Sequence, residues 1–137
     1  MKYVLKPLIS VGDYEFGANA KDYLRKKDYW LYYPPYKNLK TEDYEDERDG
    51  IKLGVENGKI ISISCRKECV YQGVNLIGMF IDEFIKQFNV TPDEIDKLWV
   101  SEKEQQEVYN FEKLGIMLWI NDEGIIKMVD AFGNEDE

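Results

Sequence analysis

Carboxylates are the most numerous side chains in this sequence that could carry acid–base chemistry or bind a cation. The 137 residues hold 27 Asp and Glu, 18 Lys and Arg and no His, so the formal net charge is −9 at pH 7. Without histidine, Ser-His-Asp and Cys-His catalytic sets and every histidine-containing zinc site are excluded. Pairs such as Asp82/Glu83 and Asp93/Glu94 stand where exposed helix charges are expected. We therefore expect no catalytic residue and no enzymatic activity.

Two cysteines, Cys65 and Cys69, stand close together in the segment CRKEC. Two thiols supply only half of the roughly four ligands that a structural zinc ion needs. We expect both to be free thiols, as in a reducing compartment. The acidic run lacks the spacing of a calcium-binding EF-hand loop, and the chain has no glycine motif for phosphate and no nucleophile elbow. The sequence therefore predicts neither a metal nor a cofactor.

The segment from residue 28 to residue 49 combines aromatic and acidic side chains. Its first part, DYWLYYPPY, is rich in Tyr and Trp, and its second part, TEDYEDERD, holds six carboxylates and one arginine. Tyr and Trp are favoured anchors of protein interfaces, and carboxylates steer a cationic partner at long range. The predicted partner-binding residues are Trp30, Tyr33, Tyr36, Glu42, Asp43, Glu45, Asp46 and Glu47. The alternative is that the aromatic rings belong to the core.

The elements that must position this segment are predicted to form two copies of one unit, at residues 2–66 and 70–132. Residues 50–64, GIKLGVENGKIISIS, resemble residues 115–130, GIMLWINDEGIIKMVD. Each stretch alternates apolar and polar residues around a glycine-containing turn, and this pattern is typical of a β-hairpin. The corresponding residues are Gly50 and Gly115, Ile51 and Ile116, Leu53 and Leu118, Val55 and Ile120, and Gly58 and Gly124.

Helices are predicted before each hairpin, at residues 18–27 and 79–88, because apolar residues recur there at helical spacing. The sequence Thr91-Pro92-Asp93-Glu94 predicts a third short helix, with Thr as N-cap and Glu closing a capping box. Further strands are expected at residues 2–8 and 107–111.

This β-α-β-β order, repeated twice, predicts an α+β fold with a largely antiparallel sheet and helices on one face. The length of the chain fits a single domain over residues 1–137. Pro34-Pro35 excludes a helix in the aromatic segment. Residues 28–49 are then expected to be the long, solvated loop between the first helix and the first hairpin.

The charge balance also bears on partners and location. A net charge of −9 opposes generic binding to nucleic acid and attachment to anionic lipid. The longest apolar runs, near residues 76–81 and 115–120, are far shorter than the ~20 residues of a membrane span, and the first residues lack the pattern of a signal peptide. We expect a cytoplasmic protein that binds neither nucleic acid nor membrane.

In its small size, its acidity and the segments EDYEDERD and YWLYYPPYKN, the chain resembles the immunity proteins of bacterial contact-dependent inhibition and related polymorphic-toxin systems. The segments FGANAKD (16–22) and IGMFIDE (77–83) are also similar to the βαββ units of the beta-lactamase inhibitory protein and of the outer-membrane assembly lipoprotein class. Those units also open with a glycine followed by an acidic helix start. Both resemblances imply binding rather than catalysis, and neither assigns a role to a single residue.

The sequence therefore predicts a non-enzymatic acidic immunity protein that binds and neutralises a basic toxin domain, with a nuclease as the expected kind of toxin. One alternative is an intracellular domain that binds a small ligand or regulates another protein through the open face of the sheet. Another is a hydrolase that uses carboxylates alone. If the interface lies elsewhere, the next candidate is the second acidic helix, around Asp82 and Glu83, together with residues 93–107.

Overall fold

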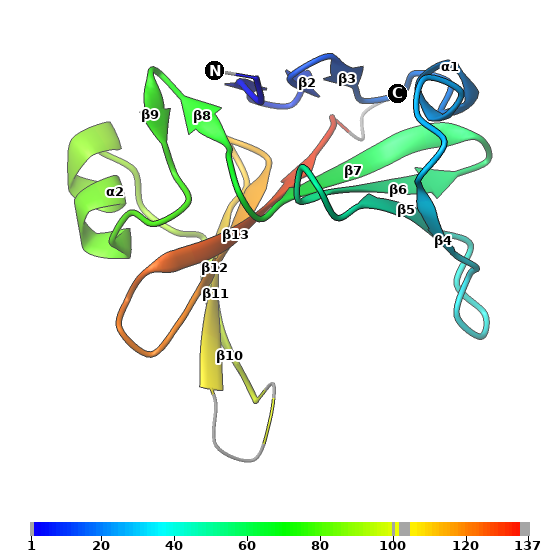
Figure 1. The fold of residues 1–137 in the computed structure, drawn as a ribbon. Helices are drawn as coiled ribbons and strands as arrows, with labels where there is room; N and C mark the ends of the chain where they lie inside the picture. Colours follow the sequence, from blue (N-terminus) through cyan, green and yellow to red (C-terminus); the bar gives the residue numbers. More distant parts are fainter. Residues whose placement is uncertain (1, 100, 102–104, 135–137) are drawn as a thin grey trace.

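The computed structural model describes residues 2–99, 101 and 105–134, and its main feature is a large, twisted antiparallel sheet (Figure 1). The strands of this sheet are β4 (Leu31–Tyr33), β5 (Glu42–Asp46), β6 (Ile51–Glu56), β7 (Lys59–Cys65), β10 (Glu94–Trp99), β11 (Gln105–Phe111), β12 (Ile116–Ile120) and β13 (Ile126–Phe132). Across the described residues, these eight strands pair in the order β10-β11-β12-β13-β7-β6-β5-β4. The fold is therefore mostly antiparallel β-sheet.

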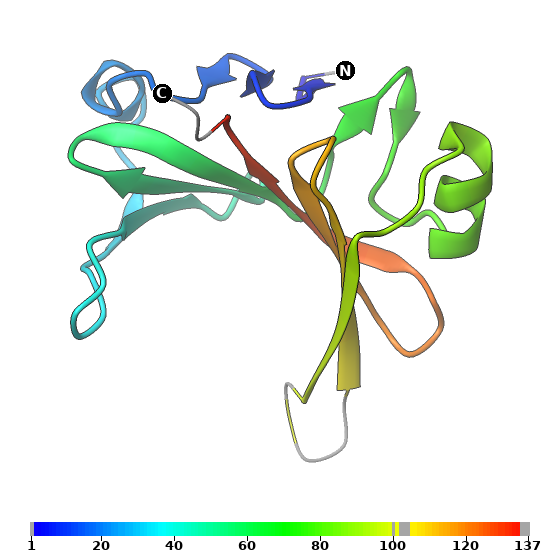
Figure 2. The same cartoon turned by 180° about the vertical axis from the view of Figure 1, so that it is seen from behind.

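The remaining elements are short and pack beside the large sheet. They are β1 (Leu5–Lys6), β2 (Ser10–Val11), β3 (Tyr14–Glu15), α1 (Lys21–Leu24), β8 (Val70–Tyr71), β9 (Val74–Asn75) and α2 (Ile81–Phe88). The first three strands and α1 lie near the β5–β7 part of the sheet, and β8, β9 and α2 lie near β11–β13 (Figures 1 and 2). Both helices fall inside the predicted ranges 18–27 and 79–88 but are shorter, so helix is a small part of the described fold.

Both predicted hairpins are confirmed. Leu53 pairs with Ile63 across β6 and β7, and Leu118 pairs with Val129 across β12 and β13. All four side chains are 0% exposed. The alternation of apolar and polar residues places them on one side of the sheet, where they form the centre of the core.

The prediction of a third helix at residues 91–94 is wrong. Glu94 begins β10, and all six residues of that strand pair with β11. The carboxylate of Asp93 accepts the backbone N–H of Glu112 at 2.7 Å, and the Asp93 N–H donates to the carbonyl of Asn110 at 2.7 Å. A helix cap is worth about 1 kcal/mol, which a six-residue pairing with a distant strand outweighs.

The prediction of one long loop over residues 28–49 is also wrong, because this segment contains two strands of the large sheet. Tyr32 of β4 pairs with Tyr44 of β5, and their ring centroids lie 5.1 Å apart. Tyr44 in turn pairs with Leu53, on the core side, so the strand is anchored in the apolar layer. The charge run is compatible with a strand because its carboxylates at alternate positions point away from that layer.

Candidate functional site

Side chains that alternate with the buried ones form the second side of the large sheet, which we call the outer face. One row of cross-strand partners crosses all eight strands on this face: Leu31, Glu45, Lys52, Ser64, Asp130, Met117, Asn110 and Glu94. Beside this row, Tyr33 of β4 pairs with Asp43 of β5, and Asp43 pairs with Gly54 of β6. The outer face therefore brings acidic and aromatic side chains of distant segments together.

A groove of about 720 Å³ lies where the outer face meets the segment after β4. It is lined by Tyr33, Pro34, Pro35, Tyr36, Lys37, Asp43, Glu45, Lys52 and Arg66. Four of the eight predicted site residues, the two tyrosines with Asp43 and Glu45, thus line a single groove. The two prolines hold the chain extended between the tyrosines, because proline fixes its own φ and restricts the residue before it.

Asp43 is the unusual member of this groove. Its side chain is half-buried, and no hydrogen-bond or ion-pair partner for its carboxylate is found among the described residues. Gly54, opposite on β6, has no side chain to cover it, and a Cβ there would collide with Ser62 Oγ. Burial raises the pKa of Asp43; Lys52 acts in the opposite direction, and Asp130 and Glu45 add to the rise. A desolvated carboxylate without a partner costs stability, which makes it a candidate for binding an external cation.

Hydrogen bonds to carboxylates hold the tyrosines on both sides of β5. Tyr33 OH donates to Glu45 Oε1 at 3.0 Å, and this bond raises the pKa of the Tyr33 phenol. On the other side of β5, Glu42 accepts from Tyr32 OH at 2.9 Å and from Tyr44 OH at 3.2 Å. Both carboxylates are therefore engaged with tyrosines, and Glu45 orients Tyr33 at the edge of the groove.

The aromatic segment is mainly surface. Six of its large side chains are between 38% and 68% exposed: Tyr29, Leu31, Tyr32, Tyr33, Tyr36 and Leu39. This exposure shows that these six side chains are not part of the core, because core side chains lie below a few per cent. Adjacent tyrosines of β4 point to opposite sides of the sheet: Tyr32 pairs with Tyr44, and Tyr33 pairs with Asp43 on the outer face.

Trp30 and Asp46 are placed differently from the other predicted site residues. The half-buried Trp30 ring lies 6.3 Å from the Tyr14 ring, edge to face, and its buried Nε1–H finds no acceptor among the described residues. Asp46 is 0% exposed and forms an ion pair of 2.6 Å with Lys27 Nζ. Neither side chain lines the groove, while Glu47 is exposed in the turn between β5 and β6.

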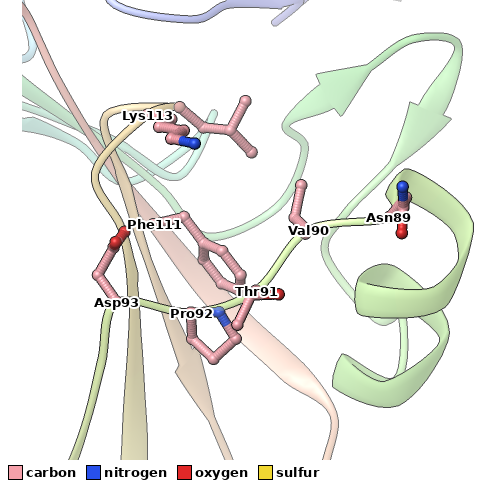
Figure 3. Close-up of a pocket in the computed structure, with 8 residues that line it drawn as sticks. Asn89, Val90, Thr91, Pro92, Asp93, Phe111 and Lys113 are labelled. Carbon is pink, nitrogen blue, oxygen red and sulfur yellow. The ribbon is translucent and has the colours of Figure 1, made fainter.

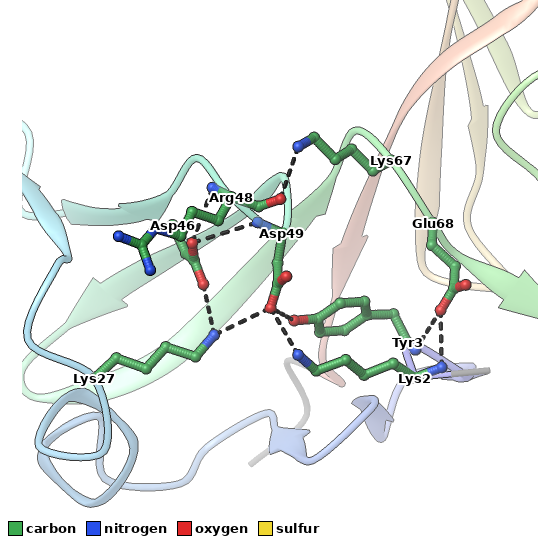
Figure 4. A network of polar contacts seen from close by, with 8 residues as sticks. All are labelled: Lys2, Tyr3, Lys27, Asp46, Arg48, Asp49, Lys67 and Glu68. Atoms are coloured by element: carbon green, nitrogen blue, oxygen red, sulfur yellow. Dashed lines mark hydrogen bonds and ion pairs between the residues drawn. The ribbon is translucent and has the colours of Figure 1, made fainter.

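A network of charges surrounds Asp46 (Figure 4). Lys27 Nζ lies between Asp46 and Asp49, and Asp49 Oδ2 accepts from Lys2 Nζ at 2.8 Å and from Tyr3 OH at 2.5 Å. The hydrogen bonds from Lys2 and Tyr3 hold the pKa of Asp49 well below its usual range. Burial alone would lower the pKa of Lys27, but the bond to Asp46 and nearby charges raise it overall. The network ties the first residues to the β5–β6 turn.

Sequence reasoning missed this network because its members are far apart in the chain. One signal of a buried charge was present, because Asp46 and Phe111 occupy equivalent positions in the two units. Asp46 pairs with Ile51, and Phe111 pairs with the corresponding residue Ile116. A carboxylate at the position of a buried phenylalanine indicates a buried charge that needs a partner.

A second cavity, of about 330 Å³, lies between the end of α2 and the start of β10 (Figure 3). Its walls include the apolar side chains of Val90, Pro92, Phe111 and Leu114. The carboxylate of Asp93 at its rim is already bound to the backbone N–H of Glu112. The cavity lies at the lower end of the size range of ligand sites, and the carboxylate at its rim is already engaged within the chain.

Cys65 and Cys69 are both buried free thiols. The hydrogen bond to Cys69 and burial raise the pKa of the Cys65 thiol, which suppresses the reactive thiolate. In the part of the chain that the structure describes, no three cysteine or carboxylate side chains are grouped as metal ligands would be. Neither helix there has the length and apolar character needed to cross a membrane.

Comparison with protein-family models, with curated proteins and with solved structures finds no match for this chain.

Proposed function

We propose that this chain is a non-enzymatic, cytoplasmic immunity protein that binds and neutralises a basic toxin domain, with a nuclease as the expected kind of toxin. The observation that carries the proposal is the half-buried Asp43 carboxylate, which has no partner among the described residues and lies in a groove beside exposed tyrosines. A cationic side chain of the partner would add a direct contact to a carboxylate that Lys52 affects only through its charge. The resulting charge-assisted hydrogen bond is of the stronger kind.

The charge of the outer face supports a basic partner. In the described cross-strand pairs of this face the carboxylates are Asp43, Glu45, Glu56, Glu94, Asp96 and Asp130, and the lysines are Lys52 and Lys59. The groove itself also carries Lys37 and Arg66, so the acidic excess belongs to the whole face and not to the groove alone. The whole chain adds a net charge of −9, which attracts cations over a distance of about 8 Å at physiological salt. A nuclease must hold phosphates with basic residues, so an acidic surface competes directly for them.

The site residues then divide into three roles. Tyr33 and Tyr36 are the anchoring rings, because they are exposed and line the groove. Asp43 and Glu45 face the partner's cation, and the exposed Glu47 contributes to steering. Of the other predicted partner-binding residues, Asp46 is buried and Trp30 and Glu42 are half-buried, and none of the three lines the groove, so we assign them to positioning the segment.

We also infer that the chain is a duplicated α+β unit with its helices on one face. Matched hydrogen bonds support this. Gly17 N–H donates to the Ile60 carbonyl at 2.7 Å, as Gly78 N–H does to Ile126 at 2.8 Å. The next pair is Ala20 N–H to Gly58 and Ile81 N–H to Gly124, both at 2.9 Å. Each unit contributes four strands to the sheet, so the outer face extends over both units.

A growth-protection assay tests the proposal. A basic toxin encoded next to this chain's gene is co-expressed with the wild type, with the variant Asp43→Asn/Glu45→Gln, or with the control Asp122→Asn/Glu123→Gln. The control changes the same number of charges in the exposed turn between β12 and β13. Protection by the wild type and the control, but not by the groove variant, is the expected result. If the wild type gives no protection, or the groove variant protects fully, the proposal is wrong.

A further inference from the structure

β10 forms one edge of the large sheet and is unusually open. All six of its residues pair with β11 in unbroken register, and all six are exposed. No strand in the described residues pairs with its other side. An edge strand of this length presents a row of unpaired backbone N–H and C=O groups, which is a template for another strand.

The opposite edge of the sheet, formed by β4, is protected against the addition of another strand, whereas β10 is not. β4 has three residues, and Pro34-Pro35 follows it directly. Short edge strands and prolines are ordinary means of preventing strand addition. β10 has neither device, and its register with β11 contains no bulge.

Exposed apolar side chains accompany the open edge. Ile95 is 47% exposed, Leu98 is 42% exposed and Trp99 is 68% exposed. Ile95 and Trp99 point to one side of the sheet and Leu98 to the other, because side chains alternate along a strand. A strand added beside β10 would cover apolar surface on both sides.

We propose that β10 is a strand-addition site for an extended, basic segment of the partner protein. This inference rests on the proposed function, because it assigns the basic segment to the toxin. Glu94 and Asp96 lie two residues apart on the outer face. Lys or Arg opposite them, with β-branched residues opposite Ile95, would complete the pairs that stabilise neighbouring strands.

A second copy of this chain is a poor occupant of the same edge. Strands that pair antiparallel about a two-fold axis must bring side chains of the same face together. Centred pairing of β10 with itself therefore sets Asp96 against Asp96 or Lys97 against Lys97, and like charges directly opposite are destabilising. The strand's own charges thus favour a partner of different sequence.

The experiment uses the full chain and three synthetic hexapeptides, and it follows hydrogen–deuterium exchange of residues 94–99. The first two peptides are Lys-Val-Lys-Val-Lys-Val and Glu-Val-Glu-Val-Glu-Val. The third has the Lys-Val sequence with its backbone amides N-methylated along both edges, so that neither edge can donate hydrogen bonds to β10. We expect the first peptide alone to slow exchange in β10. Asp96→Lys should weaken its binding about tenfold, since an attractive cross-strand pair becomes repulsive. The control Asp122→Lys, with the same charge change in an exposed turn, should bind as the wild type does.

Three outcomes overturn the inference: no protection of β10 by the Lys-Val peptide, equal protection by the Glu-Val peptide, or equal protection by the N-methylated peptide. Protection of β4 and β5 instead of β10 would also overturn it, while leaving recognition of a basic partner intact. Failure of the proposed function itself is read separately, from the growth-protection assay with the groove variant.

Discussion

Ser64 of β7 pairs directly with Asp130 of β13, and Ser64 Oγ donates a 2.5 Å hydrogen bond to Asp130 Oδ1 at the junction of the two hairpins. Trp119 Nε1 donates to the other carboxylate oxygen at 2.8 Å. Both oxygens of Asp130 are therefore occupied within the chain. The central carboxylate of the outer face joins the hairpins, whereas the carboxylate of Asp43, nearer the edge, has no hydrogen-bond or ion-pair partner among the described residues.

Replacing Asp130 by Ala should lower the free energy of unfolding by about 2–3 kcal/mol, because two partly buried donors lose a charged acceptor. Urea unfolding measures this. Asp122→Ala, in an exposed turn, should change the free energy by less than about 0.5 kcal/mol. Equal effects of the two substitutions would show that Asp130 does not join the hairpins.

Replacing Asp43 by Asn should leave the chain as stable as the wild type or make it more stable, because the substitution removes a desolvated charge without a partner among the described residues. The same substitution should weaken partner binding. Thermal unfolding and calorimetric titration of one protein sample measure the two effects. A destabilised Asp43→Asn protein would mean that the carboxylate has a structural role.

The pH dependence of stability should differ in sign between Asp49 and Asp43. The lowered pKa of Asp49 contributes stability above its unfolded value of about 3.9, and this contribution is lost as the pH falls through the folded pKa. The raised pKa of Asp43 costs stability at neutral pH, and this cost is relieved as the pH falls.

Asp49→Asn should therefore be less stable than the wild type at pH 7, by about 1–3 kcal/mol, and this difference should shrink toward pH 2. Chemical unfolding between pH 2 and 7 checks this. A difference that stays constant over the whole range would contradict the assigned hydrogen bonds from Lys2 and Tyr3.

Both cysteines should be unreactive in the folded protein. Cys65 and Cys69 are 0% exposed, and the raised pKa of Cys65 keeps its thiol protonated at neutral pH. A chromogenic disulfide reagent should label neither thiol without denaturant and both in concentrated urea. Rapid labelling of the folded chain would show that this part of the core opens easily.

The hairpins could be predicted from the sequence because their signals are local. Leu53 and Leu118 stand in regular alternation beside glycine-containing turns, and the pairing partner follows within a few residues. The segment at Thr91 misled the prediction for the opposite reason. Its capping pattern is local, but Glu94 and its neighbours pair with β11, whose register no local pattern gives.

Part of the candidate site could be brought together from the sequence. Composition was enough to single out Tyr33, Tyr36, Asp43 and Glu45, which the structure brings into one groove. It could not separate Asp46 from its neighbours, because only the sheet register shows that this carboxylate points into the core. The alternation of β5 explains the difference: successive carboxylates face opposite sides of one strand.

The most direct test of the account is the dissociation constant for the basic toxin domain encoded beside this chain's gene, measured calorimetrically for the wild type and for Asp43→Asn/Glu45→Gln. Tight binding by the wild type and at least about tenfold weaker binding by the variant are predicted, because the variant leaves the partner's cation without its counter-charge. Asp122→Asn/Glu123→Gln should bind as the wild type does. Equal dissociation constants for the wild type and the groove variant, or no binding by the wild type, would contradict the central claim.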